Sequence, residues 1–400
     1  PAQMTATTLA DWLKAESPDS RVFSVSGKDR GAITLTGHRG DGAFWFTDGF
    51  GLTTYVEPGQ SAEARLAPVA AFNENFRAEM AGPEGVARQW TGAWPQCQAL
   101  AEDWTIRGQT FHSQVPPVRA QFDKSPQLDE ATVDAALYLL ESQQLGRRGV
   151  VDMLGVSLSA TDRIGHAYGT QGPEMCEQMM RLDTALGRLL DALPPSSVLV
   201  LTADHGGSDF VERLHDHGYP HARRTDWNVV RAINAEARER FDLDYDAITP
   251  GGSGLMIGDA GQRALPEPLR GQILALALER LRADPDIAFA ESRDVLLAEP
   301  MPPRDRKPDM LNVRQRYRLS MVAERSPDII VASAENVVGG GRVGGTIANH
   351  GTPWDYDRRV PILFWWPGVD FQERFLPIRT IDIAPTLANL IGVETPPVDG

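Results

Sequence analysis

The sequence predicts an α/β fold with a mostly parallel central sheet. Short apolar runs alternate with amphipathic helical patterns along much of the chain, which is the order of elements that builds a parallel sheet. Polar clusters follow several of these runs, as is typical of the carboxyl ends of parallel strands. With 400 residues, of which 42% are hydrophobic, the chain can bury one large core or two ordinary ones.

The expected strands share a short apolar run bounded by polar or turn residues. They are Arg21–Ser26, Gly149–Ser157, Ser197–Thr202, Asp328–Ala332 and Val360–Trp365. The second and third of these strands flank a helical pattern, so we expect them to form a βαβ unit in which each strand ends in a polar cluster.

The expected helices have apolar residues spaced three and four apart, or signals of a helix start and end. They are Thr8–Ala15, Asp129–Gln144, a helix that begins near Pro173, one around Pro268–Ala283, and Ile383–Leu390. Gly146 and Gly392 can end two of them. In the helix after Pro173, the residues expected on the buried face are Met175, Met179, Leu182, Leu186 and Leu189.

We expect a single domain over residues 1–400 with two insertions. Residues 31–122 are rich in aromatic residues, Gly and Pro, and residues 206–325 mix loops, a helix and short strands. The polar clusters lie on either side of both stretches, so we interpret them as an insertion and an insertion or cap on one α/β core.

Charge and composition exclude some classes of function. The formal net charge of -15 argues against nucleic acid as a partner, because binding it requires a basic surface. No run approaches the roughly 20 apolar residues that span a bilayer. The sequence opens at Pro1 without an initiator Met, so we expect that an upstream segment has been removed. Cys97 and Cys176 fit two buried thiols or one bridge, and the sequence does not decide between them.

Three polar clusters carry potential metal ligands. Asp162 and His166 follow one expected strand, Asp204 and His205 follow the next, and His350 precedes the strand at Val360. Alone, each pair is more often a helix cap or an ordinary polar residue. Three such clusters at strand ends favour a nitrogen and oxygen site for Zn²⁺ or a similar ion. His215, His217 and His221 have a similar spacing but lie among charged residues, and we interpret them as a solvated surface loop.

Lys28 and Arg30 form a fourth cluster, at the end of the Arg21–Ser26 strand. In an extended backbone, residues two apart point the same way, so both cations would face one oxyanion. Arg offers a planar fork to phosphate oxygens and Lys offers a point charge. The plain alternative is an exposed run of charges.

With these residues in place, the chain resembles the alkaline phosphatase superfamily, and within it the bacterial zinc alkaline phosphatases of the PafA/PhoK type. The resemblance is carried by motifs in the family's order, which span nearly the whole chain. They are Lys28-Asp29-Arg30-Gly31-Ala32-Ile33, Thr161-Asp162-x-x-Gly165-His166-x-Tyr168-Gly169, Ala203-Asp204-His205-Gly206, Asn349-His350-Gly351-Thr352 and Asp382-Ile383-Ala384-Pro385-Thr386-Leu387.

This resemblance implies a three-layer sandwich with inserted cap regions. It implies one zinc on Asp162, His166 and His350, and a second on Asp204 and His205, with no requirement for magnesium. Lys28 and Arg30 would contact the phosphoryl oxygens. Phe72 and Asn73 lie in a stretch that resembles a family segment near the active site, so they are expected to contact substrate.

The implied reaction is the hydrolysis of phosphate monoesters through a covalent phospho-enzyme, as in an alkaline phosphatase. The Thr or Ser nucleophile, the family's first strand and one zinc ligand are expected before Pro1, because Thr5, Thr7 and Thr8 fit helix capping and surface positions. The expected partners are small phosphate esters. The resemblance also implies a monomer that is exported to the periplasm or secreted.

The alternatives are a phosphodiesterase or nucleotide pyrophosphatase of the same superfamily, which would share the metal ligands, and a zinc-binding fragment without catalysis. The Lys28 and Arg30 pair argues against the phosphodiesterase. A sulfatase is disfavoured because its formylglycine motif is not visible in the sequence.

Overall fold

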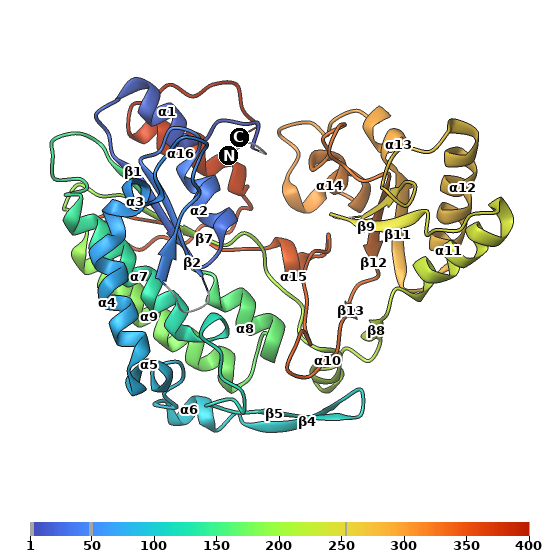
Figure 1. Ribbon diagram of the computed structural model, residues 1–400, viewed down its shortest axis with the longest axis horizontal. Helices are drawn as coiled ribbons and strands as arrows, with labels where there is room; N and C mark the ends of the chain where they lie inside the picture. The colour runs from blue at the N-terminus through green and yellow to red at the C-terminus, as the bar shows by residue number, and fades with distance from the viewer. Residues whose placement is uncertain (1–3, 48–50, 253, 400) are drawn as a thin grey trace. The chain divides into compact units, whose positions relative to one another are not determined.

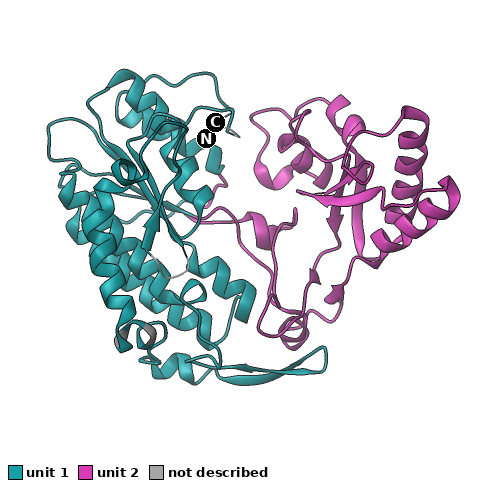
Figure 2. Cartoon of the chain, viewed as in Figure 1, with its two compact units in different colours: residues 1–202, 362–374, 379–400 teal, residues 203–361, 375–378 magenta. Residues whose placement is uncertain are grey.

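The computed structural model describes residues 4–47, 51–252 and 254–399 of the chain. It divides into two compact units, which Figure 2 distinguishes by colour. The first unit comprises residues 1–202, 362–374 and 379–400, and the second comprises residues 203–361 and 375–378. Among the described residues, no helix has the length and apolar character needed to cross a membrane.

The first unit is built on a sheet with the strand order β3-β2-β1-β6. The strands are β1 (Val22–Ser26), β2 (Gly42–Thr47), β3 (Gly51–Thr53) and β6 (Met153–Ser157). Strand β1 is parallel to both β2 and β6, and only the edge strand β3 is antiparallel. Every residue of β1 is buried, as expected for the central strand of a sheet that is covered on both faces. The predicted α/β fold with a mostly parallel sheet is therefore confirmed.

Helices cover this sheet on both sides, and Figure 1 shows α7 and α9 on one side of β1 and β2, with α1, α2 and α16 on the other. The helices of the unit are α1 (Leu9–Glu16), α2 (Asp29–Thr36), α3 (Ala62–Leu66), α4 (Ala70–Ala81), α5 (Pro83–Ala87), α6 (Pro95–Gln98), α7 (Pro126–Ser142), α8 (Ala160–Tyr168), α9 (Pro173–Ala192) and α16 (Ile383–Leu390). A hairpin of β4 (Glu102–Ile106) and β5 (Gln109–Ser113) completes it. Residues 31–122, the predicted insertion, thus include α2 and β2, which belong to the central layers.

The predicted βαβ unit differs from the observed pairing. Strand β7 (Leu199–Thr202) pairs antiparallel with β14 (Ile362–Trp365), and the two form a sheet of their own in the part of the chain that is described. The apolar residues of β7 are only half-buried, and Leu363 of β14 is 50% exposed. Interior strands of α/β sheets are normally buried on both faces.

The N-terminal threonines have the predicted capping and surface roles. Thr8 is the N-cap of α1, and its backbone N–H donates to Asp11 Oδ2 at 2.9 Å. Thr7 Oγ1 accepts a hydrogen bond from Trp12 Nε1. Helix α1 packs on α16 through a cluster of apolar residues that includes Leu13.

The buried face of helix α9 is shifted from the predicted one. Of the predicted residues, Leu189 is buried and Met179 is 40% exposed, and the buried residues also include Glu174, Glu177, Gln178 and Arg181. The helical period was predicted correctly, but the buried stripe is largely polar. This arrangement requires that every buried charge has a partner.

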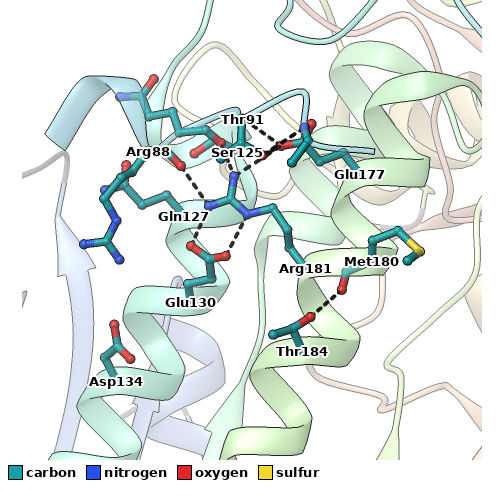
Figure 3. A network of polar contacts seen from close by, with 12 residues as sticks. Arg88, Thr91, Ser125, Gln127, Glu130, Asp134, Glu177, Met180, Arg181 and Thr184 are labelled. Carbon is teal, nitrogen blue, oxygen red and sulfur yellow. Dashed lines mark hydrogen bonds and ion pairs between the residues drawn. The ribbon is translucent and has the colours of Figure 1, made fainter. Parts of the chain in front are cut away.

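Arg181 pairs with one carboxylate of α9 and with one of α7, as Figure 3 shows. The guanidinium is 5% exposed and donates to Glu130 of α7 at 2.7 Å and to Glu177, one turn earlier in α9, at 3.3 Å. It also donates to the backbone carbonyls of Arg88 and Gln89. One buried cation therefore joins α7, α9 and the loop that follows α5.

The segment after this loop is hydrogen-bonded to α9. The Glu177 carboxylate accepts the backbone N–H groups of Thr91 and Gly92 at 2.8 and 2.9 Å. The Glu174 carboxylate accepts hydrogen bonds from the Ser113 hydroxyl and from the backbone N–H of Gln114. The two cysteines, which the sequence left open, form a disulfide between Cys97 of α6 and Cys176 of α9. Helix α9 is thus the support to which the segment from residue 88 to 114 is attached.

The second unit has an antiparallel sheet with the strand order β11-β12-β10-β9. Its strands and helices are α10 (Val211–Asp216), β8 (Arg223–Thr225), α11 (Asn228–Phe241), β9 (Ile248–Gly251), β10 (Gly254–Ile257), α12 (Glu267–Ala283), β11 (Ile287–Ser292), α13 (Arg293–Ala298), α14 (Val313–Leu319), β12 (Ile329–Ser333), β13 (Val337–Gly339) and α15 (Asp355–Arg358). Helices α11 and α12 contribute Ile233, Ile273 and Leu281 to its core. The predicted cap region, residues 206–325, lies within this unit, and the scheme of one domain with insertions stays a prediction.

We predict that Arg181→Met destabilises the first unit by about 3–5 kcal/mol, because it leaves two carboxylates without their buried cation. The matched control is Arg188→Met on the same helix. Arg188 pairs with Asp134 on the surface, with 45% and 39% of the two side chains exposed, so its loss costs below about 1 kcal/mol. Denaturant unfolding of both variants measures the difference. A similar shift of the midpoint in both would contradict the role of Arg181.

Candidate metal centre

Helix α8 carries two of the predicted metal ligands in the first unit. It begins at Ala160, three residues after the end of β6, and it places Asp162 and His166 four residues apart on one face. Asp162 Oδ1 lies 3.3 Å from His166 Nε2, and the two side chains are 17% and 28% exposed. A carboxylate oxygen and an imidazole nitrogen at this separation can bind one ion, and the role of the two residues as ligands stays a prediction.

The far end of α8 is anchored by Tyr168. Its ring lies edge-on to Trp90 and stacks with Phe111, and its hydroxyl donates to the Arg119 carbonyl oxygen. Burial of the ring raises the pKa of the Tyr168 hydroxyl well above its usual range. The helix then ends at Gly169, whose φ of 95° favours glycine. The helix that carries the ligands is therefore held at its C-terminal end by an aromatic cluster.

Lys28 lies against the same carboxylate. Its Nζ donates to Asp162 Oδ2, the oxygen that does not face His166, and both side chains are largely buried. The structure thus brings together the predicted phosphate-binding lysine and a predicted metal ligand, which are far apart in the sequence.

Arg30 does not follow the expected geometry. The sequence predicted that Lys28 and Arg30 extend from one strand and point the same way, but α2 begins at Asp29. Arg30 therefore lies in the first turn of a helix, where residues two apart do not share a face. Its side chain is 79% exposed and its Nη1 lies 3.9 Å from Asp29 Oδ1.

The turn between β1 and α2 is fixed by two close contacts. Arg163 of α8 donates to the Gly27 carbonyl oxygen at 3.1 Å, which ties this turn to the ligand-bearing helix. A Cβ on Gly31 would lie 2.4 Å from Ser157 Oγ and 2.6 Å from Ser26 Oγ. Only glycine fits at this position, so the start of α2 can lie directly on the ends of β1 and β6.

The second unit carries the other predicted ligands. Asp204 and His205 begin this unit directly after β7, and His350 lies in the loop before α15. The rings of His205 and His350 stack at 3.5 Å between centroids, with 17° between their planes. His205 Nε2 lies 3.4 Å from Asp204 Oδ2, although 83% of the Asp204 side chain is exposed. Two imidazoles and a carboxylate from segments far apart in sequence therefore meet in this unit.

Asp357 of α15 organises the loop that presents His350. The Asp357 Oδ2 atom accepts both the N–H and the hydroxyl of Thr352 at 2.6 Å, and the carbonyl oxygen of Asp357 accepts the N–H of Gly206. The Asp357 side chain is 3% exposed. It thus links the two loops that carry His205 and His350. The sequence reasoning missed this residue because its local signal, one acid in a charged segment, is that of an ordinary surface charge.

Phe72 and Asn73 have packing roles in α4. The side-chain oxygen of Asn73 accepts a hydrogen bond from the backbone N–H of Leu52 at 2.7 Å, and its side-chain nitrogen donates to the Leu52 carbonyl oxygen at 2.9 Å. Asn73 is 3% exposed. Phe72 packs against Phe46 and Phe76. These contacts fix α4 on β3, and a direct contact with substrate stays a prediction.

The alternative histidine cluster lies on the surface, as predicted. His215, His217 and His221 are all exposed. His215 lies at the end of α10 rather than in a loop, and its Nε2 is 2.6 Å from the Ala222 carbonyl oxygen.

Comparison with known proteins identifies similar sequences over nearly the whole chain. The profile of the family described as Type I phosphodiesterase / nucleotide pyrophosphatase matches residues 3–353. The alkaline phosphatase PhoD of Zymomonas mobilis is 34% identical over 96% of this chain and 67% of its own length. The alkaline phosphatase PhoK of a Sphingomonas species is 33% identical over 99% of this chain and 70% of its own length.

The fold is also that of a solved structure. The crystal structure of the alkaline phosphatase PafA superposes with a TM-score of 0.78 at 21% sequence identity. The match covers 98% of this chain and 76% of PafA. The similarity supports the architecture predicted from the sequence, with a mostly parallel sheet between layers of helices.

We predict that Asp357→Ala loosens the His350 loop, because the N–H and the hydroxyl of Thr352 both lose the carboxylate oxygen to which they donate. The amide hydrogen exchange of Thr352 should accelerate by about tenfold or more, the equivalent of roughly 1–3 kcal/mol of local stability. Asp355→Ala is the matched control, since Asp355 lies on the same short helix and pairs with Arg358 on the surface. Unchanged exchange at Thr352 in the Asp357 variant would refute the role.

Proposed function

Because the chain belongs to the Type I phosphodiesterase / nucleotide pyrophosphatase family, within the alkaline phosphatase superfamily, we propose that it forms the larger part of a zinc-dependent alkaline phosphatase. Its substrates would be small phosphate monoesters. The observation that carries the proposal is the contact between Lys28 and Asp162. It joins a cation suited to a phosphoryl oxygen to a helix that presents a metal-binding pair.

The proposed metal ligands are the Asp and His residues of the sequence motifs. They form two groups in the structure, Asp162 with His166 and His205 with His350. Asp162, His166 and His350 would hold one zinc ion, and Asp204 and His205 would hold part of a second site. Nitrogen and oxygen donors of this kind suit Zn²⁺, and no separate magnesium is required in the proposal. When bound, the ions would supply charge stabilisation for the attacking and leaving oxygens of the phosphoryl group. The pairing of Asp162 with His166 and the stacking of His205 on His350 support the assignment.

The residues of the chain itself would bind and orient the phosphoryl group. Lys28 would donate to a non-bridging oxygen, and its contact with Asp162 keeps the ammonium beside the ligand helix. Arg30 is exposed at the start of α2, where its guanidinium can meet an incoming phosphate through a bidentate contact. A monoester carries more charge on these oxygens than a diester, so the pair would favour monoesters.

The nucleophile, a Thr or Ser, would come from a segment before residue 1. The half-exposed apolar strand β7 supports this part of the proposal, since such a strand in an α/β sheet is normally buried between neighbours. In the described residues, β6 has β1 as its sheet neighbour and β7 has β14. One further strand beside β6 or β7 would complete the sheet and could carry the attacking hydroxyl.

A phosphodiesterase or nucleotide pyrophosphatase is the second candidate, and the matching family profile bears that name. It would use the same metal ligands. A zinc-binding fragment without catalysis is the third possibility, if no nucleophile is supplied to the site. The Lys28 contact favours the monoesterase over both.

The proposed location is the periplasm or the extracellular space. The disulfide between Cys97 and Cys176 supports it, because disulfides persist mainly in oxidising compartments. A monomer that acts on small molecules fits this proposal, and the acidic chain, with a formal net charge of -15, disfavours nucleic acid as a partner.

We expect His350→Ala to abolish tight zinc binding at the proposed first site, because it removes one of three protein ligands. Elemental analysis after dialysis against a weak chelator measures the zinc content. His221→Ala, in the exposed histidine cluster, is the control and should retain the content of the unmodified chain. A zinc content that is equal in the two variants would remove His350 from the ligand set.

In a longer chain that includes the preceding residues, Lys28→Ala should lower kcat/KM for a phosphate monoester by about 10²–10³-fold, the usual effect of one lost charge-stabilising donor. The loss for a diester should be at least about tenfold smaller, because a diester carries less charge on the oxygens that Lys28 would contact. The ratio of the two kcat/KM values is the readout. Equal losses on both substrates would favour the phosphodiesterase.

A further inference from the structure

A buried acid on α7 contacts the start of the helix that carries Asp162 and His166. Asp129 is 1% exposed, and its Oδ1 accepts the backbone N–H of Ala160, the first residue of α8, at 2.9 Å. The local N-cap residue, Ser159, makes no side-chain capping hydrogen bond. The first turn of α8 therefore takes its acceptor from another helix rather than from its own sequence.

The second oxygen of Asp129 connects to α9. Gln178 Nε2 donates to Asp129 Oδ2 at 2.8 Å and to Thr161 Oγ1 at 3.0 Å. Gln178 is fully buried, and Thr161 directly precedes Asp162. One amide thus holds both the acid of α7 and the residue beside the proposed metal ligand.

The charge on Asp129 suits this contact. Burial raises the pKa of Asp129 to about 6, while hydrogen bonds from the backbone of Ala160 and from Gln178 oppose the rise. The carboxylate is therefore mostly ionised at neutral and alkaline pH. A negative charge at the N-terminus of a helix is stabilised by the helix dipole, which strengthens the hold on α8.

We propose that Asp129 and Gln178 are positioning residues, which fix the first turn of α8 and thereby set the direction in which Asp162 and His166 point. The inference rests on the proposed metal-binding function of these two side chains. Outer contacts that orient metal ligands typically change metal affinity or activity by about 10–100-fold when they are removed. Neither positioning residue touches the reacting groups.

The contact can be tested by exchanging its two chemical groups. In Asp129→Asn the amide oxygen can still accept from Ala160 and the amide N–H can donate to Gln178 Oε1, so this variant should keep most of the contact. Gln178→Glu places a carboxylate against the Asp129 carboxylate and removes the donor that Asp129 needs. The double variant again pairs one acid with one amide. In it, the new amide oxygen at position 129 can still accept from Ala160. The new carboxylate at position 178 can accept from the amide at position 129 and from the Thr161 hydroxyl.

The first readout is amide hydrogen exchange over residues 159–162 in the protein without added zinc. Gln178→Glu should accelerate exchange there by about tenfold or more, and the double variant should return it close to the original rate. Asp134→Asn is the control on α7, since Asp134 lies on the same helix as Asp129 in a surface pair with Arg188. A role in global stability alone would accelerate exchange in α7, α8 and α9 together.

The second readout is the zinc dissociation constant, measured by competition with a chromogenic chelator. It should rise by about 10–100-fold in Gln178→Glu and recover in the double variant. Unchanged exchange at residues 159–162 in Gln178→Glu overturns the inference, whether or not zinc binds. If the unmodified chain binds no zinc, the proposed function fails, while the exchange data still decide the positioning role. If Gln178→Glu does not fold, the double variant decides by whether it restores α8.

Discussion

The buried polar face of α9 is the constraint on which the first unit depends. Glu177 is fully buried and Arg181 is 5% exposed, and taking two charges out of water costs several kcal/mol unless each is well paired. The pairing comes from α7, from the loop after α5 and from backbone N–H groups. Because these partners lie in segments far apart in sequence, pairing the buried charges of α9 also holds α7 and the loop after α5 in place.

The same helix supports the proposed chemistry. Helix α8 packs against α9, and it presents Asp162 to the Lys28 ammonium. Arg163 of α8 also donates a hydrogen bond to the Gly27 carbonyl oxygen, in the turn that precedes Lys28. The proposed phosphate-binding cation and the proposed carboxylate ligand are therefore placed by one set of rigid elements, which is the arrangement that precise positioning requires.

The sequence predicted those features that local pattern determines. The strand at Arg21–Ser26 and the helix at Ile383–Leu390 were predicted correctly, because their apolar spacing and end signals are local. The buried face of α9 was predicted only in part. Leu189 is buried, but so are Glu177 and Arg181, which are paired by residues that no helical period reveals. The extended backbone expected at Lys28 and Arg30 was wrong, because α2 begins at Asp29. The segment after Lys28 contains glycine and β-branched residues of low helix propensity. Gly31 nevertheless lies in the helix, close to Ser26 and Ser157. Asp129 was missed because its partners, Ala160 and Gln178, are distant in sequence. Asp357 was missed because one acid in a charged segment is typical of an ordinary surface charge.

The two pairs of proposed metal ligands, Asp162 with His166 and His205 with His350, differ in how much of the chain must fold before the two side chains meet. Asp162 and His166 lie one helical turn apart, so forming α8 is enough to bring them together. His205 and His350 meet only when most of residues 203–361 have folded, because nearly the whole unit separates them along the chain. A contact of such high contact order forms late and is lost early. Destabilising changes in the core of the second unit, remote from His205 and His350, would therefore separate the two rings as effectively as the loss of one histidine. If the two histidines bind zinc as proposed, such changes would lower the zinc content of the protein without altering any ligand.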